Sequence, residues 1–160
     1  MSANRKVWFN LYAAFFLSAF VIFVMQCSQN NNSVKKGQDV SFKITISEGG
    51  GFSGQVKGYH LLADGTVQHW QQVPGQKESI LWQSKQDPAT ILKIKNQLEK
   101  SSALEKEYTE KGNMTTTVTY VLPDTTYTWS WPGVGAMGNV PPEFRQWFAE
   151  VTKFCQAIRK

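Results

Sequence analysis

Few residues of this 160-residue chain have the types and spacing that catalysis requires. Its two histidines, His60 and His69, flank an Asp-Gly pair at 64–65 that is typical of a β-hairpin turn. A two-residue turn would set the histidines opposite each other, whereas a bulged three-residue turn would move His69 opposite Tyr59. In either register two imidazoles are fewer than the three or four ligands that zinc takes, so we expect no metal site and no cofactor.

Covalent hydrolysis is not indicated either. It needs a nucleophile, a histidine within hydrogen-bond reach and a group that orients the histidine. The sequence has no Gly-x-Ser-x-Gly motif, and Cys155 falls on the apolar stripe of a late predicted helix. The twelve carboxylates are scattered and offer no pair whose geometry can be argued. We therefore predict that the protein is not an enzyme.

A glycine-rich segment is the strongest candidate for a binding site. In chain order it contains Gly49, Gly50, Gly51, Phe52, Ser53 and Gly54. Glycines allow a backbone to approach a partner closely, and an aromatic side chain placed among them has the character of an interface anchor. The alternative is a wide hairpin turn in which Phe52 folds back on the sheet edge.

Trp70 and Trp82 are a second candidate, because their places are less determined by pattern than those of the other tryptophans. If both are exposed, they form an aromatic platform for a glycan or a peptide. The alternative is that they are buried, since tryptophan at strand spacing is more often a core residue than a ligand site.

The N-terminal part of the chain is predicted to hold the protein at a membrane. Residues 7–25 are almost wholly apolar, and a helix of that length spans about 28 Å, close to the ~30 Å thickness of the hydrocarbon layer. Arg5 and Lys6 precede the segment with no acidic residue between them. This charge favours a cytoplasmic N-terminus and an extracytoplasmic domain.

The fate of this segment is open among a retained anchor, outright cleavage, and cleavage before Cys27 with lipidation of that cysteine. The charged start, the apolar run, the cysteine and the polar tract after it resemble a bacterial lipoprotein signal. We divide the chain into a signal anchor or lipoprotein signal at 1–27, a flexible linker at 28–36 and an extracytoplasmic domain at 37–160.

The net charge of +5 does not indicate nucleic-acid binding. Residues 37–160 contain 13 lysines and arginines against 12 acidic residues, which leaves this domain nearly neutral. Phosphate binding needs a basic face on the folded domain. We therefore expect the membrane and a protein as partners, and no nucleic acid.

The domain is predicted to be α+β: a two-layer sandwich in which an antiparallel sheet carries two helices on one face. The element order is β-β-β-(β)-α-β-β-α. Alternating or short apolar runs predict strands, and an Asp-Pro pair and a 3-4-3-4 apolar spacing predict helices beginning near 87 and 141. In the second hairpin a two-residue turn at 123–124 would pair Tyr120 with Tyr127 and thereby align the apolar sets. The lysine- and glutamate-rich stretch up to Lys111 is expected to be a solvated loop or a frayed helix.

The residues at 46–54, with the strand before them and the hairpin at 64–65 after them, resemble a group of uncharacterised bacterial envelope domains that follow lipoprotein signals. More faintly, Gly-Gly-Phe-x-Gly at 50–54 is similar to the signature of emfourin-type inhibitors of protealysin. The second resemblance implies a peptidase as partner, with the glycine-rich segment in the contact.

These observations together predict a membrane-anchored, extracytoplasmic protein-binding module of the bacterial cell envelope, of which a peptidase inhibitor is one form. The alternative is a structural or glycan-contacting envelope lipoprotein that acts through Trp70 and Trp82.

Overall fold

The computed structural model describes residues 41–135 and 140–158, which form an α+β fold of one seven-stranded sheet and two helices. The predicted segments 1–27 and 28–36, Cys27 among them, lie outside the described residues. Within the described ranges no helix is long and apolar enough to cross a membrane.

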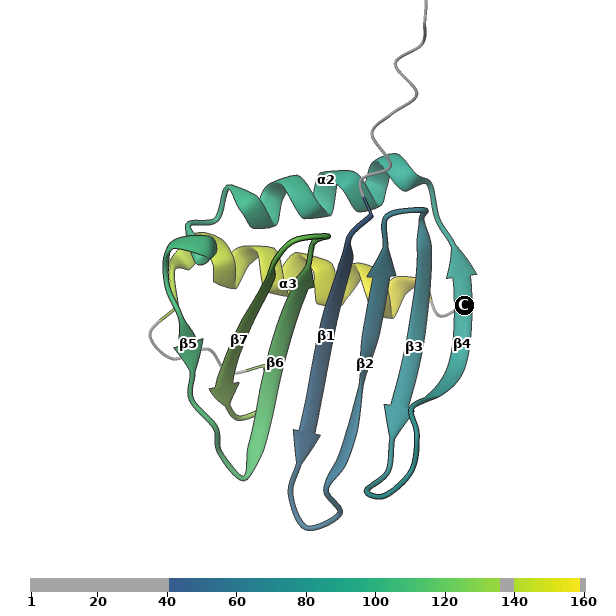
Figure 1. The fold of residues 1–160 in the computed structure, drawn as a ribbon, viewed down its shortest axis with the longest axis vertical. Coiled ribbons are helices and arrows are strands. Elements are labelled where there is room, and N and C mark those ends of the chain that lie inside the picture. The colour runs from purple at the N-terminus through teal and green to yellow at the C-terminus, as the bar shows by residue number, and fades with distance from the viewer. Residues whose placement is uncertain (1–40, 136–139, 159–160) are drawn as a thin grey trace, which may run out of the picture. The chain divides into compact units, whose positions relative to one another are not determined.

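The sheet has the strand order β4-β3-β2-β1-β6-β7-β5 (Figure 1). Its strands are β1 Lys43–Gly50, β2 Gln55–Leu62, β3 Thr66–Gln72, β4 Ser79–Lys85, β5 Tyr108–Thr109, β6 Met114–Val121 and β7 Thr126–Pro132. The helices are α2 Pro88–Glu99 and α3 Pro142–Ala157, with a 3₁₀ turn, η1, at Ala103–Glu105.

The prediction of a wholly antiparallel sheet is wrong at one edge, because β5 runs parallel to β7. The stretch expected to be a loop or frayed helix instead pairs Tyr108 with Trp129. The indole nitrogen of Trp129 donates to the carbonyls of Ala103 at 3.0 Å and Lys106 at 3.2 Å, which ties the segment to the core. A two-residue strand has no periodicity of its own, so only these tertiary bonds define it.

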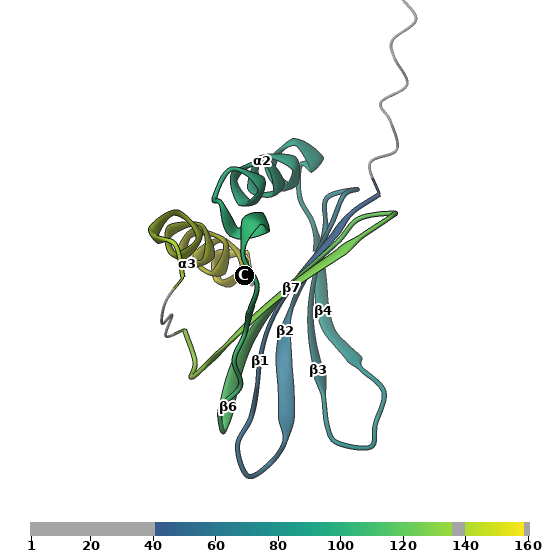
Figure 2. The same ribbon diagram turned by 60° about the vertical axis from the view of Figure 1, so that its left-hand side comes forward.

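Both helices cover the same face of the sheet (Figure 2), as predicted. The Asp87 side chain accepts from the backbone nitrogen of Ala89 at 2.9 Å and caps α2. The buried stripe of α2 is Ile91, Ile94 and Leu98, and that of α3 is Phe144, Trp147, Phe148, Val151 and Cys155. We call the covered side the helix face and the other side the open face.

The second hairpin has the predicted register, with Tyr120 opposite Tyr127 and Val118 opposite Trp129. A two-residue connection closes it, and the backbone nitrogen of Leu122 donates to the carbonyl of Thr125 at 2.8 Å. With such a short turn only one register buries the apolar residues of both strands. The sequence pattern was therefore sufficient to predict the register.

The helices cover only part of the sheet, and the rest extends beyond them (Figures 1 and 2). At this extended end lie three strand connections: β1–β2, β3–β4 and β5–β6. The first residue of β1 lies at the opposite end of the sheet. The fold therefore gathers three loops at the end of β1 farthest from Lys43.

Candidate functional site

The glycine-rich segment forms the connection between β1 and β2. Gly50, Gly51 and Gly54 all have positive φ, at 114°, 66° and 60°. The Gly51 nitrogen donates to the carbonyl of Asn113 at 2.6 Å, and the Gly54 nitrogen donates to the Gly51 carbonyl at 3.2 Å. The connection is therefore a hydrogen-bonded turn fastened to the neighbouring β5–β6 loop.

Two glycines of this turn are required by close contacts as well as by backbone conformation. A Cβ on Gly50 would collide with the carbonyl of Asn113, and one on Gly54 would lie 2.9 Å from Cγ of Pro74. Side chains at positive φ are also strained. The loop is thus held between the β5–β6 connection on one side and the β3–β4 connection on the other.

Phe52 lies at the tip of this turn with its side chain fully exposed to solvent. It does not fold back on the sheet edge, which was the alternative to a binding role. Beside the turn are exposed Val73 and Pro74 on one side and partly buried Met114 on the other. We call Phe52, Val73, Pro74 and Met114 the tip surface.

The two histidines lie on opposite faces of the sheet. The first hairpin turns through three residues, 63–65, so that His69 lies opposite Tyr59 and His60 opposite Gln68. The Gly65 nitrogen donates to the Leu62 carbonyl at 3.0 Å, and Gly65 has a φ of 91°. Across the described ranges no three His, Cys, Asp or Glu side chains are grouped as metal ligands.

His60 is the centre of a hydrogen-bond network that the sequence did not reveal. Its Nδ1 lies 2.9 Å from the Thr45 hydroxyl, and its Nε2 lies 2.9 Å from Oε1 of Glu78. A neutral ring with its proton on Nε2 satisfies both contacts, since Nε2 then donates to the carboxylate and Nδ1 accepts from the hydroxyl. Burial lowers the pKa of His60, and the hydrogen bond that Nε2 donates to Glu78 only partly offsets this.

This network has the connectivity of a hydroxyl–imidazole–carboxylate relay, in which a base activates a nucleophile. A substrate, however, would have to reach the hydroxyl and ring. His60 is 4% exposed and stacks on Trp70 at 5.1 Å between ring centroids, and Trp70 is itself 5% exposed. The arrangement favours a structural role, in which Glu78 holds the β3–β4 connection against the open face.

Trp70 and Trp82 do not form a shared exposed platform. A bulge between His69 and Trp70 interrupts the register of β3 with β4. Trp70 stacks with His60 on the open face, whereas Trp82 lies beside His69 on the helix face with ring centroids 5.7 Å apart. Trp82 is only partly buried and packs against the core, so it alone retains exposed aromatic surface.

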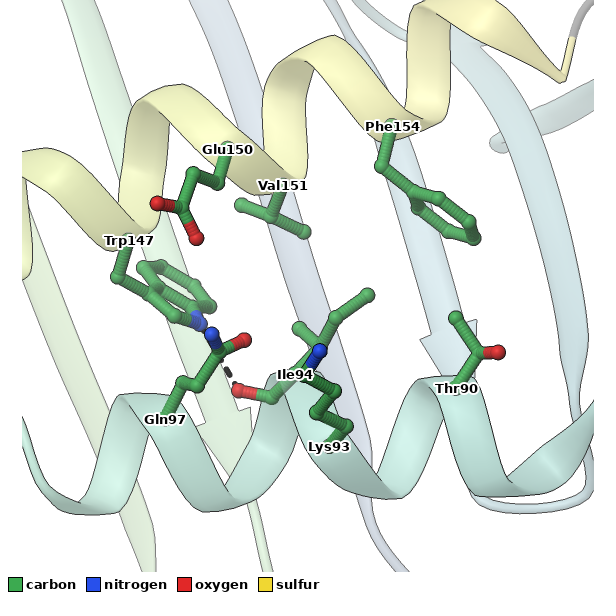
Figure 3. Close-up of a pocket in the computed structure, with 8 residues that line it drawn as sticks. All are labelled: Thr90, Lys93, Ile94, Gln97, Trp147, Glu150, Val151 and Phe154. Carbon is green, nitrogen blue, oxygen red and sulfur yellow. Dashed lines mark hydrogen bonds between the residues drawn. The ribbon is translucent and has the colours of Figure 1, made fainter.

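The hollow between α2 and α3 (Figure 3) is a seam of the core. Figure 3 shows Trp147 and Val151 of α3 directed towards Ile94 of α2, and the indole nitrogen of Trp147 donates to the Ile94 carbonyl at 2.9 Å. Each of these three side chains is already buried. The seam of about 190 Å³ therefore offers little apolar surface to a ligand.

Cys155 is buried within the core, as predicted, and is a free thiol. Burial raises the pKa of Cys155 to about 12. A thiol that stays protonated at neutral pH is a poor nucleophile, so its role is packing.

Comparison with known proteins does not assign the chain to a family. No family model matches it, and no curated protein matches it. The resemblance to envelope domains and to emfourin-type inhibitors therefore stays a prediction from the residues at 46–54.

Proposed function

We propose that this chain is a membrane-anchored, extracytoplasmic protein-binding module that contacts its partner through the tip surface. The observation that carries the proposal is Phe52, a fully exposed aromatic side chain at the tip of a turn fastened on both sides. It acts by binding and not by catalysis, and its place is the bacterial cell envelope.

A fully exposed phenylalanine has a large free energy to gain from burial against a partner. Complete burial of such a side chain is worth roughly 1.5–3 kcal/mol. The loop that carries Phe52 is already ordered by the hydrogen bond from Gly51 to Asn113 and by the hydrogen bond from Gly54 to Gly51. A preorganised loop loses little conformational entropy on binding, so more of that gain appears as affinity.

The position of the tip surface suits a tethered protein. Strand β1 has eight residues, which separate its first residue from the turn by about 26 Å. An anchor at residues 7–25, or a lipid on Cys27, would join the domain on the Lys43 side of that strand. The tip surface lies at the other end of β1.

Peptidase inhibition is the form of binding that the Gly-Gly-Phe-x-Gly motif suggests, and a metallopeptidase is the corresponding partner. The alternative, a glycan-contacting role through Trp70 and Trp82, has less support because Trp70 is buried beneath the open-face network. Only Trp82 remains for such a contact.

The test is capture of partners from detergent-solubilised envelope by the full chain, with Phe52→Ala as the binding variant. Leu92→Ala is the matched control, since Leu92 is also an exposed apolar residue but lies on α2. Wild type and Leu92→Ala are expected to capture the same protein and Phe52→Ala to lose it. If Phe52→Ala folds and still captures that protein, the tip surface is not the contact. An enriched peptidase is then assayed for inhibition by the same three proteins.

A further inference from the structure

A second surface, separate from the tip surface, has the form of a small-ligand site. A cavity of about 340 Å³ lies between the sheet and the C-terminal half of α3. Strands β1, β2 and β3 form one wall, and Thr152 and Gln156 of α3 form the other. The volume is at the lower end of the range of small-molecule pockets, which is roughly 300–1,000 Å³.

Two opposite charges line this cavity without pairing to each other. Glu48 of β1 and Lys57 of β2 are directly opposite in the strand register, and both border the cavity. The ion pairs among the described residues are His60–Glu78, Lys85–Asp64 and Lys95–Glu99, and none of these includes Glu48 or Lys57. Directly opposite residues have Cβ atoms about 5 Å apart, which brings a carboxylate and an ammonium to one wall.

This pair of charges discriminates between classes of ligand. A ligand with one charge is attracted by one of the two groups and repelled by the other at similar distance. A ligand with a positive and a negative group a few ångströms apart is attracted by both. The wall therefore selects a small zwitterion.

An aromatic surface lies next to the charges. Tyr59 and His69 border the cavity, lie opposite each other on β2 and β3, and stack with ring centroids 4.9 Å apart. Trp82 lies beside both rings, with centroids 6.1 Å from Tyr59 and 5.7 Å from His69. Such a surface suits a flat or apolar side chain.

We infer that this cavity binds a free α-amino acid with an aromatic or large apolar side chain. The ligand carboxylate meets the Lys57 ammonium, its own ammonium meets the Glu48 carboxylate, and its side chain packs on Tyr59 and His69. The inference goes beyond the proposed function and does not depend on it, because Phe52 and the rest of the tip surface do not line the cavity.

The ligand requirement is tested by calorimetric titration of the detergent-solubilised full chain with four compounds that share one side chain. L-Phenylalanine carries both charges, N-acetyl-L-phenylalanine the negative one, L-phenylalanine amide the positive one, and N-acetyl-L-phenylalanine amide neither. Each blocked charge removes a charge-assisted hydrogen bond, so L-phenylalanine is expected to bind about tenfold or more tighter than each of the others. Equal affinity for all four, or no saturable binding of L-phenylalanine, overturns the inference.

Two variants assign the charges to residues. Glu48→Gln is expected to make L-phenylalanine and its N-acetyl derivative bind alike, and Lys57→Gln to do the same for L-phenylalanine and its amide. Lys111→Gln, at an exposed position outside the cavity, is the control and should keep the wild-type preference. If both site variants melt like the wild type and still prefer the zwitterion, the cavity does not bind as inferred. Loss of partner capture by Phe52→Ala would leave this result unaffected, so the two proposals fail separately.

Discussion

A histidine and a tryptophan lie side by side on each face of the sheet, and the two pairs differ in what surrounds them. On the open face His60 and Trp70 stack with an interplanar angle of 15° and are both buried. On the helix face His69 and Trp82 are tilted by 41°, and His69 borders a cavity. The histidine and tryptophan on the face without helices are therefore the more buried of the two pairs.

The difference comes from what covers each pair. The β3–β4 connection brings Glu78 to His60, although Glu78 directly precedes β4 and β3 lies between β4 and β2. On the other face, the residues of β1, β2 and β3 that line the cavity lie across it from Thr152 and Gln156 of α3. The histidine is therefore buried on one face and borders a cavity on the other.

The largest expected effect is the loss of stability on truncation of Trp70, which we compare with truncation of Trp82. Trp70→Ala removes a buried, packed indole. Truncation of a buried tryptophan lowers the free energy of unfolding by about 3–5 kcal/mol. Trp82→Ala should cost distinctly less, because Trp82 is only partly buried. Urea denaturation followed by circular dichroism measures both. Equal losses would mean that the two faces are packed alike.

A smaller effect is expected at Thr45. Thr45→Val keeps the shape of the side chain but removes the hydroxyl that Nδ1 of His60 contacts at 2.9 Å. A buried nitrogen left without a partner costs about 1–3 kcal/mol. Thr119→Val is the control, because Thr119 lies directly opposite Thr45 on β6, whereas the hydroxyl that contacts His60 belongs to Thr45; it should be near neutral. The same denaturation experiment decides between a network that stabilises the fold and one that is incidental.

The smallest expected effect is on the pH dependence of folding stability. The pKa of His60 is lowered in the folded state, so between that pKa and the ordinary value of 6.5 the unfolded chain binds more protons than the folded one. Stability conferred by the neutral ring is therefore present above pH 6.5 and is lost as the pH falls through the folded pKa. His60→Gln should flatten this part of the stability profile. His69→Gln, on the other face, should leave the contribution of His60 in place, and an unchanged slope in His60→Gln would contradict the assignment.

The two hairpins show when a sequence pattern is enough to predict the register of paired strands. In the second hairpin, a two-residue connection and two apolar sets allow one register, and the structure has it. In the first, the Asp-Gly pair at 64–65 is compatible with two- and three-residue turns, so the places of His60 and His69 stayed open. The structure contains the three-residue turn and separates the histidines by the thickness of the sheet.

For the candidate sites, the sequence identified single residues better than combinations. It singled out Phe52 and the glycines around it, because exposure of a short glycine-rich turn is a local property. It missed Glu48 with Lys57 and Thr45 with Glu78, because the members of each pair lie on different strands or connections and no pattern within one element relates them. Only the pairing of β1 with β2, and the path of the β3–β4 connection, bring those groups together.

The sequence by itself determined the α+β class, the starts of the two helices and the apolar stripes on them, since those depend on local signals and on periodicity within one element. Only the tertiary structure decided the parallel edge strand β5, the faces on which the histidines lie, and the cavity beside α3. Each of these depends on contacts between segments many residues apart. Such contacts are set by packing and by how far the helices extend over the sheet. Neither can be predicted from local composition.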